Sequence, residues 1–380
     1  MLYRSDDIKA KAERLGFSFA GVTRAEQTPH FINYLDEISR QDLADLSFLG
    51  LPYVIEGRRN PANLLHGAKS VIVLGASYPP SPSNHFADTD DVAATIAGYA
   101  ILPDYHKILK EKAKEFVAEL QADTAQEIHA RIFIDSGPLM EKDMAFKAGV
   151  VWIGKHSLAI HPQFGSNFFI ACLLTDLDIF WGNEGTVQDL CGSCQKCVLA
   201  CPTSCINDHV ITLSRCVSYL TIEHKGAIPR DLRQKIGTRI FGCDTCQNVC
   251  PCNSAPLQPQ NGYFFAPEPS VPQPLDLVAA LALDESSFQE KFSSTPIFRI
   301  GYERFMRNAA IAAGNSHNSA CIPALKHVLQ LGTDLINIHA IWALGQFPDK
   351  ETRQFLLDYL QTGTSTACAE EIREVLDLTR

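Results

Sequence analysis

Hydrophobic residues in the first half of the chain follow two periods. Recurrence every three to four residues predicts helices, and short continuous apolar runs predict strands buried in a sheet. Helices are expected over 6–15, 105–121 and 140–149, and strands over 70–76, 132–134 and 168–174. Because helices and strands alternate, we expect residues 1–185 to form an α/β domain that holds a substrate or a cofactor.

The pattern changes abruptly beyond this region. From about 189 to 253 the chain is rich in Cys, Gly and short turns, which predicts an inserted cluster domain. Residues 251–274 are rich in Pro, Asn, Gln and Ser, which is typical of a surface linker. The expected class is therefore a mixed α+β or α/β multidomain protein, with domains at 1–185, 186–262 and 263–380.

The last domain is rich in Ala and Leu and contains an internal repeat. Residues 307–315 match 338–346 in the positions of their small residues, at a period of 31 residues. Small residues at matching helical positions are typical of stacked helix pairs of the HEAT type. An ordinary helical bundle is the alternative, and the repeat favours a HEAT-like domain.

Composition narrows the class of protein. The 380 residues are 46% hydrophobic and 20% charged, which is the composition of folded domains rather than of a disordered chain. The N-terminus lacks the apolar core of a secretory signal, and no apolar run has the length of a membrane span. We therefore expect a cytoplasmic protein with no membrane segment.

Charge is distributed unevenly along the chain. A net charge of −10 argues against a whole surface adapted to nucleic acid. Basic residues nevertheless gather in a stripe between the cysteine runs and in a cluster at the start of the helical repeat. They are Lys225, Arg230, Arg233, Lys235 and Arg239 in the stripe, and Arg299, Arg304 and Arg307 in the cluster. Basic helices are usually only solvated, yet two such patches on an acidic chain are what a bound polyanion requires.

Most of the 13 cysteines lie between Cys191 and Cys252, which favours metal binding over disulfides. The first run ends in Pro202 and has the bacterial ferredoxin spacing CxxCxxCxxxCP, in which three thiolates hold one [4Fe–4S] cluster and the fourth binds another. Zinc sites use paired CxxC motifs, and this spacing differs from them. The run therefore predicts two [4Fe–4S] clusters and an electron-transfer role.

A second run, formed by Cys243, Cys246 and Cys250 with Pro251, has the spacing CxxCxxxCP and supplies three more thiolates. The two runs together supply seven thiolates, and two cubane clusters need eight. Cys216, Cys205 and Cys252 are the candidates. Chain geometry does not decide among them, and we favour Cys216 because it lies between the runs. Crossing the ligands gives Cys191, Cys194, Cys197 and Cys250 on one cluster, and Cys201, Cys216, Cys243 and Cys246 on the other. The remaining Cys172, Cys321 and Cys368 lie in apolar segments and are expected to be buried without a role.

Two segments of the first domain are candidates for the site that the clusters serve. Asp135 follows the strand 131–134, and open α/β sheets bind ligands at the carboxyl ends of their strands. A turn or helix-capping aspartate is the alternative. Lys155 and His156 follow a short strand and a glycine turn, so we expect both to be exposed, either touching a cofactor or forming a solvated loop.

With these residues assembled, the chain resembles the epoxyqueuosine reductases, cobalamin- and iron–sulfur-dependent enzymes of queuosine synthesis in tRNA. The resemblance extends over nearly the whole chain. It is carried by residues 104–107, 133–138, 152–155, 191–202, 216–223 and 241–247, and by the C-terminal repeat.

The resemblance implies reduction of epoxyqueuosine to queuosine at the wobble position of tRNA. It implies base-off cobalamin beside the clusters, electrons from an external donor of the flavodoxin or ferredoxin type, and a monomer that binds the anticodon stem-loop. It also implies that Asp135 is the proton donor and that Cys216 is the eighth cluster ligand. The implied cobalamin contacts are Arg58, Gly98, Asp135, Lys155, His156 and Ser218.

One segment departs from the family pattern. Residues 98–106 read Gly-Tyr-Ala-Ile-Leu-Pro-Asp-Tyr-His, and two arginines typical of the family are absent. If either arginine contacts cobalamin or tRNA phosphate in the family, this chain binds its ligand differently or is a diverged cobalamin and iron–sulfur reductase acting on another substrate. Beside epoxyqueuosine reduction, two alternatives stay open, namely such a diverged reductase, similar to reductive dehalogenases, and a non-catalytic electron carrier.

Overall fold

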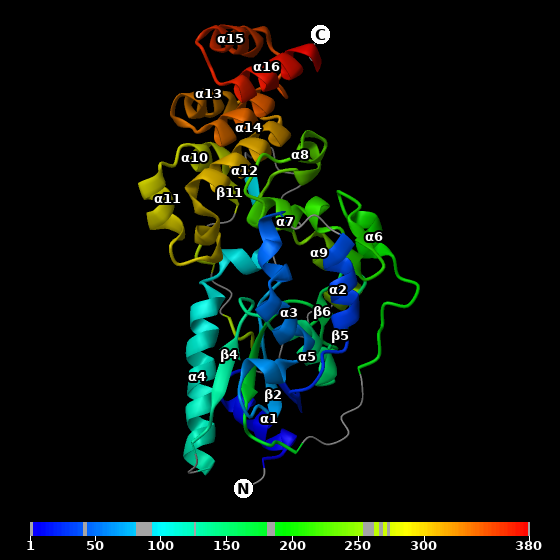
Figure 1. The fold of residues 1–380 in the computed structure, drawn as a ribbon. Helices are drawn as coiled ribbons and strands as arrows, with labels where there is room; N and C mark the ends of the chain where they lie inside the picture. Colours follow the sequence, from blue (N-terminus) through cyan, green and yellow to red (C-terminus); the bar gives the residue numbers. More distant parts are fainter. Residues whose placement is uncertain are drawn as a thin grey trace. The chain divides into compact units, whose positions relative to one another are not determined.

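The computed structural model describes residues 3–40, 44–80, 93–124, 127–180, 187–253, 262–265, 269–271 and 274–378. The chain forms two compact units, each built from separate stretches of sequence (Figure 1). The first unit consists of Met1–Pro80, Asp104–Ser214 and Thr245–Glu268, and the second of Ser81–Pro103, Arg215–Asp244 and Pro269–Arg380. The boundary expected at 185/186 lies outside the described residues, and the division into three domains stays a prediction.

A four-stranded sheet in the order β1-β2-β7-β4 forms the centre of the first unit. Its strands are β1 (Phe19–Arg24), β2 (Ser70–Ser77), β7 (Phe168–Thr175) and β4 (Ala130–Phe133). The strands expected over 70–76, 132–134 and 168–174 are therefore confirmed. Every neighbouring pair is antiparallel, so the α+β alternative describes this unit and the α/β alternative does not.

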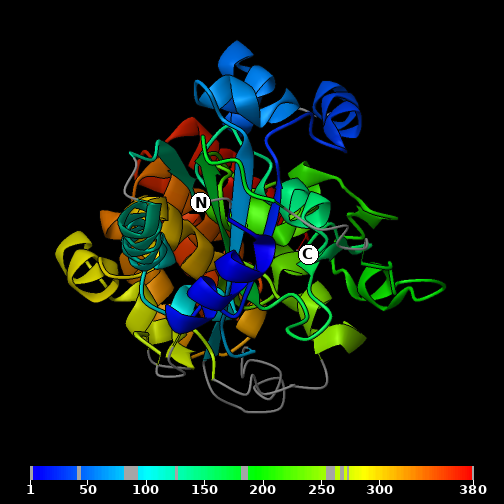
Figure 2. The same cartoon turned by 90° about the horizontal axis from the view of Figure 1, so that it is seen from below.

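Helices cover both faces of this sheet (Figures 1 and 2). Helix α5 (Glu141–Lys147) packs on the face lined by Val71, Val73, Cys172 and Leu174. All eight residues of β2 are buried, so the opposite face is covered as well. There α1 (Ser5–Arg14) contacts β1, and α4 (Tyr105–Thr124) contacts β4 and β7.

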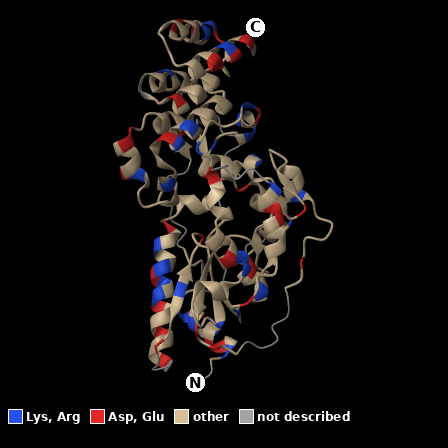
Figure 3. Cartoon of the chain, viewed as in Figure 1, with Lys and Arg blue, Asp and Glu red and all other residues tan. Residues whose placement is uncertain are grey.

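The surface of α4 carries both signs of charge along its length (Figure 3). Lys112 pairs with Glu115, and Lys114 pairs with Glu111, within the helix itself. Buried Lys11 of α1 lies 3.1 Å from Glu119 and 2.9 Å from Asp123 of α4, which joins the two helices. The exposed side of α4 is therefore solvated and stabilised by ion pairs within the helix, and its described residues form no basic patch.

The shorter elements of the first unit surround the sheet and carry most of the cysteines. They are α2 (Phe31–Arg40), η1 (Ala44–Gly50), α3 (Pro52–Arg59), η2 (Pro61–Leu64), α6 (Lys196–Ala200), α9 (Thr245–Asn248), η6 (Pro251–Asn253) and the hairpins β5 (Trp152–Ile153)–β6 (Ala159–Ile160) and β8 (Ile206–Asn207)–β9 (Val210–Ile211). Helices α6 and α9 contact each other, so Cys197 of the first cysteine run and Cys246 of the second lie on neighbouring helices.

The second unit combines a small sheet with the C-terminal helices. The sheet has the order β10-β3-β11, with β3 (Ala93–Ile96) parallel to β10 (Arg239–Phe241) and antiparallel to β11 (Leu275–Asp276). The helical elements are η4 (Gly98–Ile101), α7 (Val217–Ile222), α8 (Arg230–Ile236), α10 (Leu277–Leu281), α11 (Glu285–Phe292), η7 (Pro296–Ile300), α12 (Gly301–Ser316), α13 (Cys321–Leu331), α14 (Asp334–Leu344), α15 (Lys350–Gln361) and α16 (Thr366–Leu378), while η5 (Leu213–Arg215) spans the boundary between the units. No described helix is both long and apolar enough to span a membrane.

The two copies of the internal repeat fall on α12 and α14, and these helices pack against each other. A Cβ added at Gly314 would lie 2.8 Å from the Cα of Ala343, so only glycine permits this helix spacing. The matching small residues therefore serve close helix packing, as expected. The HEAT-like character of the domain stays a prediction. Cys172, Cys321 and Cys368 are all buried, which confirms that prediction.

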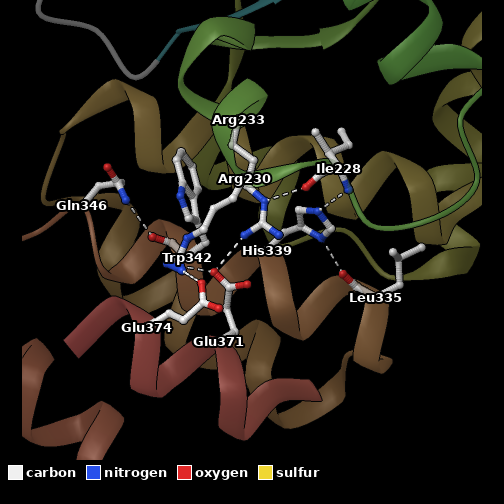
Figure 4. Close-up of polar contacts among 9 residues, drawn as sticks. All are labelled: Ile228, Arg230, Arg233, Leu335, His339, Trp342, Gln346, Glu371 and Glu374. Atoms are coloured by element: carbon white, nitrogen blue, oxygen red, sulfur yellow. Dashed lines mark hydrogen bonds and ion pairs between the residues drawn. The ribbon is translucent and has the colours of Figure 1, made fainter. Parts of the chain in front are cut away.

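Several residues of the predicted basic patches are structural (Figure 4). Arg233 is buried, donates to the Ile228 carbonyl oxygen, and lies 2.9 Å from Glu371, while Arg230 pairs with Glu371 and Glu374. Figure 4 also shows Trp342 beside Arg233. The prediction that Arg233 grips phosphate is wrong, because its side chain is used inside the protein.

The cluster at the start of the repeat is structural as well. Arg307 is fully buried and donates to the carbonyl oxygens of Leu220, His224 and Gly226. Arg304 donates to the Ile222 carbonyl oxygen. These arginines bind α12 to the segment around α7, and the expectation of a second polyanion patch is corrected accordingly.

Candidate active site

Asp135 lies two residues beyond the end of β4 and has an unusual backbone conformation. Its φ of 53° lies in the left-handed region, which Asp adopts more readily than most residues. The hydroxyl of Tyr105, the first residue of α4, donates a 2.7 Å hydrogen bond to Oδ2 of Asp135. The prediction for Asp135 assumed an open α/β sheet, which binds ligands at the carboxyl ends of its strands. That rule does not apply to this antiparallel sheet. The local turn and Tyr105 position the carboxyl group instead.

Helix α3 packs closely on the loop after Asp135. A Cβ added at Gly57 would lie 2.7 Å from the carbonyl oxygen of Pro138, so glycine allows the contact. The contact brings Arg58 to the loop, with its guanidinium 4.8 Å from the ring centre of Tyr34. Nε of Arg58 is buried and has no hydrogen-bond partner among the described residues.

Glu141, the first residue of α5, lies beside the same loop. Its Oε1 is buried without a hydrogen-bond partner in the described part of the chain. The pKa of Glu141 is raised to about 7, chiefly by burial and further by the Asp135 carboxylate, while its own main-chain amide and Arg58 oppose the shift. Sequence reasoning missed Glu141, because an acidic residue in the first turn of a helix is ordinarily a solvated one.

The hairpin β5–β6 adjoins α5. The Lys142 amine donates a 2.6 Å hydrogen bond to the carbonyl oxygen of Ser157 in the hairpin turn. His156, in the same turn, is only 1% exposed, so the prediction that it is exposed is wrong. The pKa of His156 is lowered to about 4, chiefly by burial and then by Lys142.

The tautomer of His156 follows from its contacts. Nδ1 accepts a 3.2 Å hydrogen bond from the main-chain amide of Leu158. In the neutral ring, Nε2 therefore carries the hydrogen. This buried donor has no partner among the described residues, so His156 offers a hydrogen bond to a bound group.

Lys155 points toward the first cysteine run. Its amine donates a 2.8 Å hydrogen bond to the carbonyl oxygen of Gly192 and lies 3.7 Å from Asp208. Its side chain is 11% exposed, so the expectation of an exposed lysine is corrected. Lys155 braces the loop between Cys191 and Cys194.

The same hairpin packs against the expected ligands of the first cluster. Trp152, Ile160 and Cys250 form one apolar group, against which Cys191 and Cys252 pack. Burial chiefly raises the pKa of the Cys197 thiol, and the neighbouring Cys250 and Cys194 contribute to the shift. Contacts therefore bring together all four thiols expected on the first cluster, although Cys250 is far from the others in sequence.

The thiols do not converge as they would on a single metal ion. No group of three or more Cys, His, Asp or Glu side chains in the described ranges is close enough to hold one ion. Zinc needs four ligands converging on one atom, whereas thiolates around a cubane are held apart by the cluster itself. The spacing of the first cysteine run remains the reason to expect clusters and not zinc.

The ligands expected on the second cluster are divided between the units. Cys201 and Cys246 belong to the first unit, and Cys216 and Cys243 to the second. Cys205, one of the alternatives, is buried with its Sγ 3.5 Å from that of Cys201. The choice of Cys216 stays a prediction.

Two of the expected cobalamin contacts also lie in the second unit. The main-chain amide of Gly98 donates a 2.6 Å hydrogen bond to Oδ2 of Asp244. Burial raises the pKa of Asp244 to about 6, against the opposing effect of the Gly98 amide. Ser218 lies on α7 next to buried Val217. Arg58, Asp135, Lys155 and His156 belong to the first unit.

Two family models match separate parts of this arrangement. Residues 58–136, which contain Arg58 and Asp135, match the family described as epoxyqueuosine reductase QueG, DUF1730, and residues 190–253 match the 4Fe-4S double cluster binding domain. The epoxyqueuosine reductase of Cyclobacterium marinum is 37% identical over 306 residues, covering 79% of this chain and 94% of that protein. The chain belongs to the epoxyqueuosine reductase family.

Other epoxyqueuosine reductases agree along nearly the whole chain. That of Vibrio cholerae is 36% identical over 356 residues, covering 91% of this chain and 92% of that one. A crystal structure of an epoxyqueuosine reductase with an epoxyqueuosine-modified tRNA-Tyr stem loop has a TM-score of 0.87 at 28% identity, covering 98% of both chains. Another, from Bacillus subtilis, has its catalytic aspartate loop swung out of the active site and a TM-score of 0.86 at 28% identity, covering 99% of this chain and 98% of that one. The dehalogenase-like and electron-carrier alternatives are therefore disfavoured.

The residues of the first unit fit the corrin cofactor that an epoxyqueuosine reductase implies. Three buried polar atoms of the first unit, namely Arg58 Nε, Glu141 Oε1 and His156 Nε2, have no partner in the described residues. Buried polar groups without partners are rare in folded proteins, because each lost hydrogen bond costs about 1–3 kcal/mol. Cobalamin carries peripheral amides that both donate and accept hydrogen bonds, so it could satisfy groups of this kind.

Proposed function

We propose that this chain reduces epoxyqueuosine in tRNA to queuosine, with Asp135 as the proton donor and with cobalamin and two [4Fe–4S] clusters as cofactors. The observation that carries the proposal is the carboxyl group of Asp135. It is held by Tyr105 beyond the end of β4, and it acts on Glu141, whose buried Oε1 has no partner among the described residues. A carboxyl group in this setting can deliver a proton to the epoxide oxygen.

Cobalamin, when bound, supplies a strongly reducing cobalt centre, while the protein binds and orients both reactants and excludes water. The candidates for its contacts are Arg58, Asp135, Lys155 and His156 of the first unit and Gly98 and Ser218 of the second. His156 would donate from Nε2, because its Nδ1 is already an acceptor. Lys155 would act mainly on the cluster loop, since its amine is bonded to Gly192.

Electrons would enter from an external donor of the flavodoxin or ferredoxin type and pass through the clusters. Cys191, Cys194, Cys197 and Cys250 would hold the first cluster, and Cys201, Cys216, Cys243 and Cys246 the second. The packing of Cys191 and Cys250 against the hairpin that contains His156 supports a short path from the first cluster toward the site. We place this monomeric enzyme in the cytoplasm, where thiols remain reduced and tRNA is modified.

The anticodon stem-loop of tRNA would be the substrate. Lys225 and Lys235 are exposed, whereas Arg233 and Arg307 are buried in the fold. The two lysines are therefore better candidates for phosphate contacts than the arginines. Changing both lysines to glutamate should weaken stem-loop binding and flatten its salt dependence, measured by fluorescence anisotropy at several salt concentrations. Equal affinity and slope would exclude this surface.

The test of the proposal uses anaerobically reconstituted protein and a synthetic stem-loop that contains epoxyqueuosine. Wild-type protein with a chemical reductant should form queuosine, detected by mass spectrometry of nucleosides. Asp135→Asn should slow the reaction by about 10²–10⁴-fold while keeping corrin absorbance and iron content. Asp36→Asn, which removes an exposed carboxylate paired with Arg40, is the matched control and should react normally. Fully loaded wild-type protein that forms no queuosine would refute the proposed function.

A further inference from the structure

The proposed reaction needs more protons than one carboxyl group can hold. Converting an epoxide to an alkene breaks two C–O bonds, forms the C=C bond and releases the oxygen as water. The balance requires two electrons, which the external donor supplies, and two protons. Asp135 holds one proton at a time, so a second must reach the site in every turnover.

The charged and titratable groups near Asp135 can be compared as sources of that proton. Arg58 does not release protons in proteins. The amine of Lys142 is engaged with the carbonyl oxygen of Ser157. Cys172 is fully buried in β7, and burial raises the pKa of its thiol well above the usual value, so it retains its proton. Tyr105 donates to Oδ2 of Asp135, but a phenol is a far weaker acid than a carboxyl group, so Tyr105 positions Asp135 and does not resupply its proton. Glu141 remains, and the main-chain amide of Asp135 itself interacts with the Glu141 carboxyl group.

We propose that Glu141 supplies the second proton by passing it to Asp135 after Asp135 has protonated the substrate oxygen. The inference rests on the proposed function. Glu141 affects the substrate only through Asp135, so it is a positioning residue. It holds the second proton and delivers it to Asp135. Its buried Oε1 is the atom available to carry that proton. Because Oε1 has no hydrogen-bond partner among the described residues, the proton would cross to Asp135 through one bridging water.

The electrostatic surroundings support this role. Burial and the Asp135 carboxylate raise the pKa of Glu141 to about 7, so the group carries its proton below neutral pH and can release it near pH 7. The charged and titratable neighbours are Arg58 from α3, Asp135 from the loop after β4, Cys172 from β7 and Lys142 from its own helix. The positive charge of Arg58 opposes the shift, which keeps the proton transferable.

The first test compares turnover by fully loaded variants across pH. Glu141→Gln keeps the shape of the side chain but cannot carry the proton, so the rate below pH 7 should fall by about 10- to 100-fold. The wild-type rate should decline as pH rises above about 7, and this decline should be absent in Glu141→Gln. Glu141→Asp should restore part of the rate together with the pH dependence. Glu37→Gln, which neutralises another carboxyl group near Lys142, is the matched control and should keep the wild-type profile.

The second test needs no cofactor and no turnover. Infrared difference spectra of the wild-type apoprotein should show protonated carboxyl absorption that is lost in two steps, one near pH 6 from Asp244 and one near pH 7 from Glu141, and only the step near pH 7 should be missing in Glu141→Gln. A step near pH 7 that persists in Glu141→Gln, or a wild-type rate and pH profile in that variant, would overturn the inference. Wild-type protein that forms no queuosine would refute the proposed function instead, so the two failures are distinguishable.

Discussion

The hydroxyl of Tyr105 donates a 2.7 Å hydrogen bond to Oδ2 of Asp135, which joins the start of α4 to the loop after β4. The Tyr105 ring also stacks on Phe169 of β7, with ring centres 4.0 Å apart and planes 9° apart. Phe169 thus fixes the ring, and the ring fixes the direction from which the hydroxyl reaches the carboxyl group.

Tyr105→Phe should therefore lower the rate of queuosine formation with little loss of stability, because the ring stacking remains. A hydrogen bond contributes about 0.5–1.5 kcal/mol, which corresponds to about 2- to 10-fold in single-turnover rate. Tyr302→Phe removes a hydroxyl that donates to the Leu283 carbonyl oxygen in the second unit, and it should leave the rate unchanged. Equal rates for Tyr105→Phe and wild type would show that Tyr105 does not position Asp135.

Lys155→Met should make the first cluster easier to lose. The lysine amine anchors the carbonyl oxygen of Gly192 within the cysteine loop, so without it the loop should open more often. We expect faster decay of cluster absorbance in the presence of an iron chelator, by several-fold. Lys196→Met removes an exposed lysine next to Cys197 and should decay at the wild-type rate. Identical decay of cluster absorbance in both variants would show that Lys155 does not stabilise the cysteine loop.

The eighth cluster ligand can be identified by iron analysis. Cys216→Ser should lower the iron content of reconstituted protein from about eight to about four atoms per chain, because one cluster loses a thiolate. Cys205→Ser should keep about eight, although Cys205 lies 3.5 Å from Cys201. The reverse result would assign the ligand to Cys205.

Glu371→Gln should destabilise the second unit. The guanidinium of Arg233, 4% exposed, would lose the carboxylate 2.9 Å away, and an unpaired buried charge costs about 3–5 kcal/mol. The measurement is the free energy of unfolding from denaturant titration. Glu351 pairs with Lys326 but is 88% exposed, so Glu351→Gln should cost less than about 1 kcal/mol. Similar losses in both variants would contradict the buried pair.

Stability should fall in mild acid partly because of His339. Its ring is fully buried, Nε2 accepts from the Ile228 amide, Nδ1 donates to the Leu335 carbonyl oxygen, and burial and then Arg233 hold its pKa well below 6.5. The folded state keeps the ring neutral, whereas the unfolded chain binds a proton below about pH 6.5. The contribution of His339 to the free energy of unfolding is therefore complete above pH 6.5. It is lost as pH falls, by up to about 1.4 kcal/mol per pH unit.

His339→Gln tests this dependence. The variant should be less stable than wild type at pH 7, yet it should lose less stability between pH 7 and pH 5.5. Buried His156 and partly buried His161 also have lowered pKa values, so some acid sensitivity should remain. His327→Gln, at an exposed position of α13, should keep the wild-type slope. An unchanged slope in His339→Gln would exclude the histidine as the cause.

The sequence alone determined what depends on neighbours along the chain. Apolar runs and helical periods placed β2, β7, α4 and α5, because each pattern reports a single element. The cysteine spacing predicted iron–sulfur binding for the same reason, since one loop supplies three thiolates to one cluster.

Only the tertiary structure decided which side chains are buried and which partners they find. The bond between Tyr105 and Asp135 joins residues 30 positions apart, and Arg233 meets Glu371 across 138 positions. His156 looked exposed beside a glycine turn but is buried. Strand direction was also hidden, because an apolar run has the same pattern in a parallel or an antiparallel sheet. Burial and pairing depend on residues that the local pattern does not contain, and the pKa values of Glu141 and His156 follow from that burial.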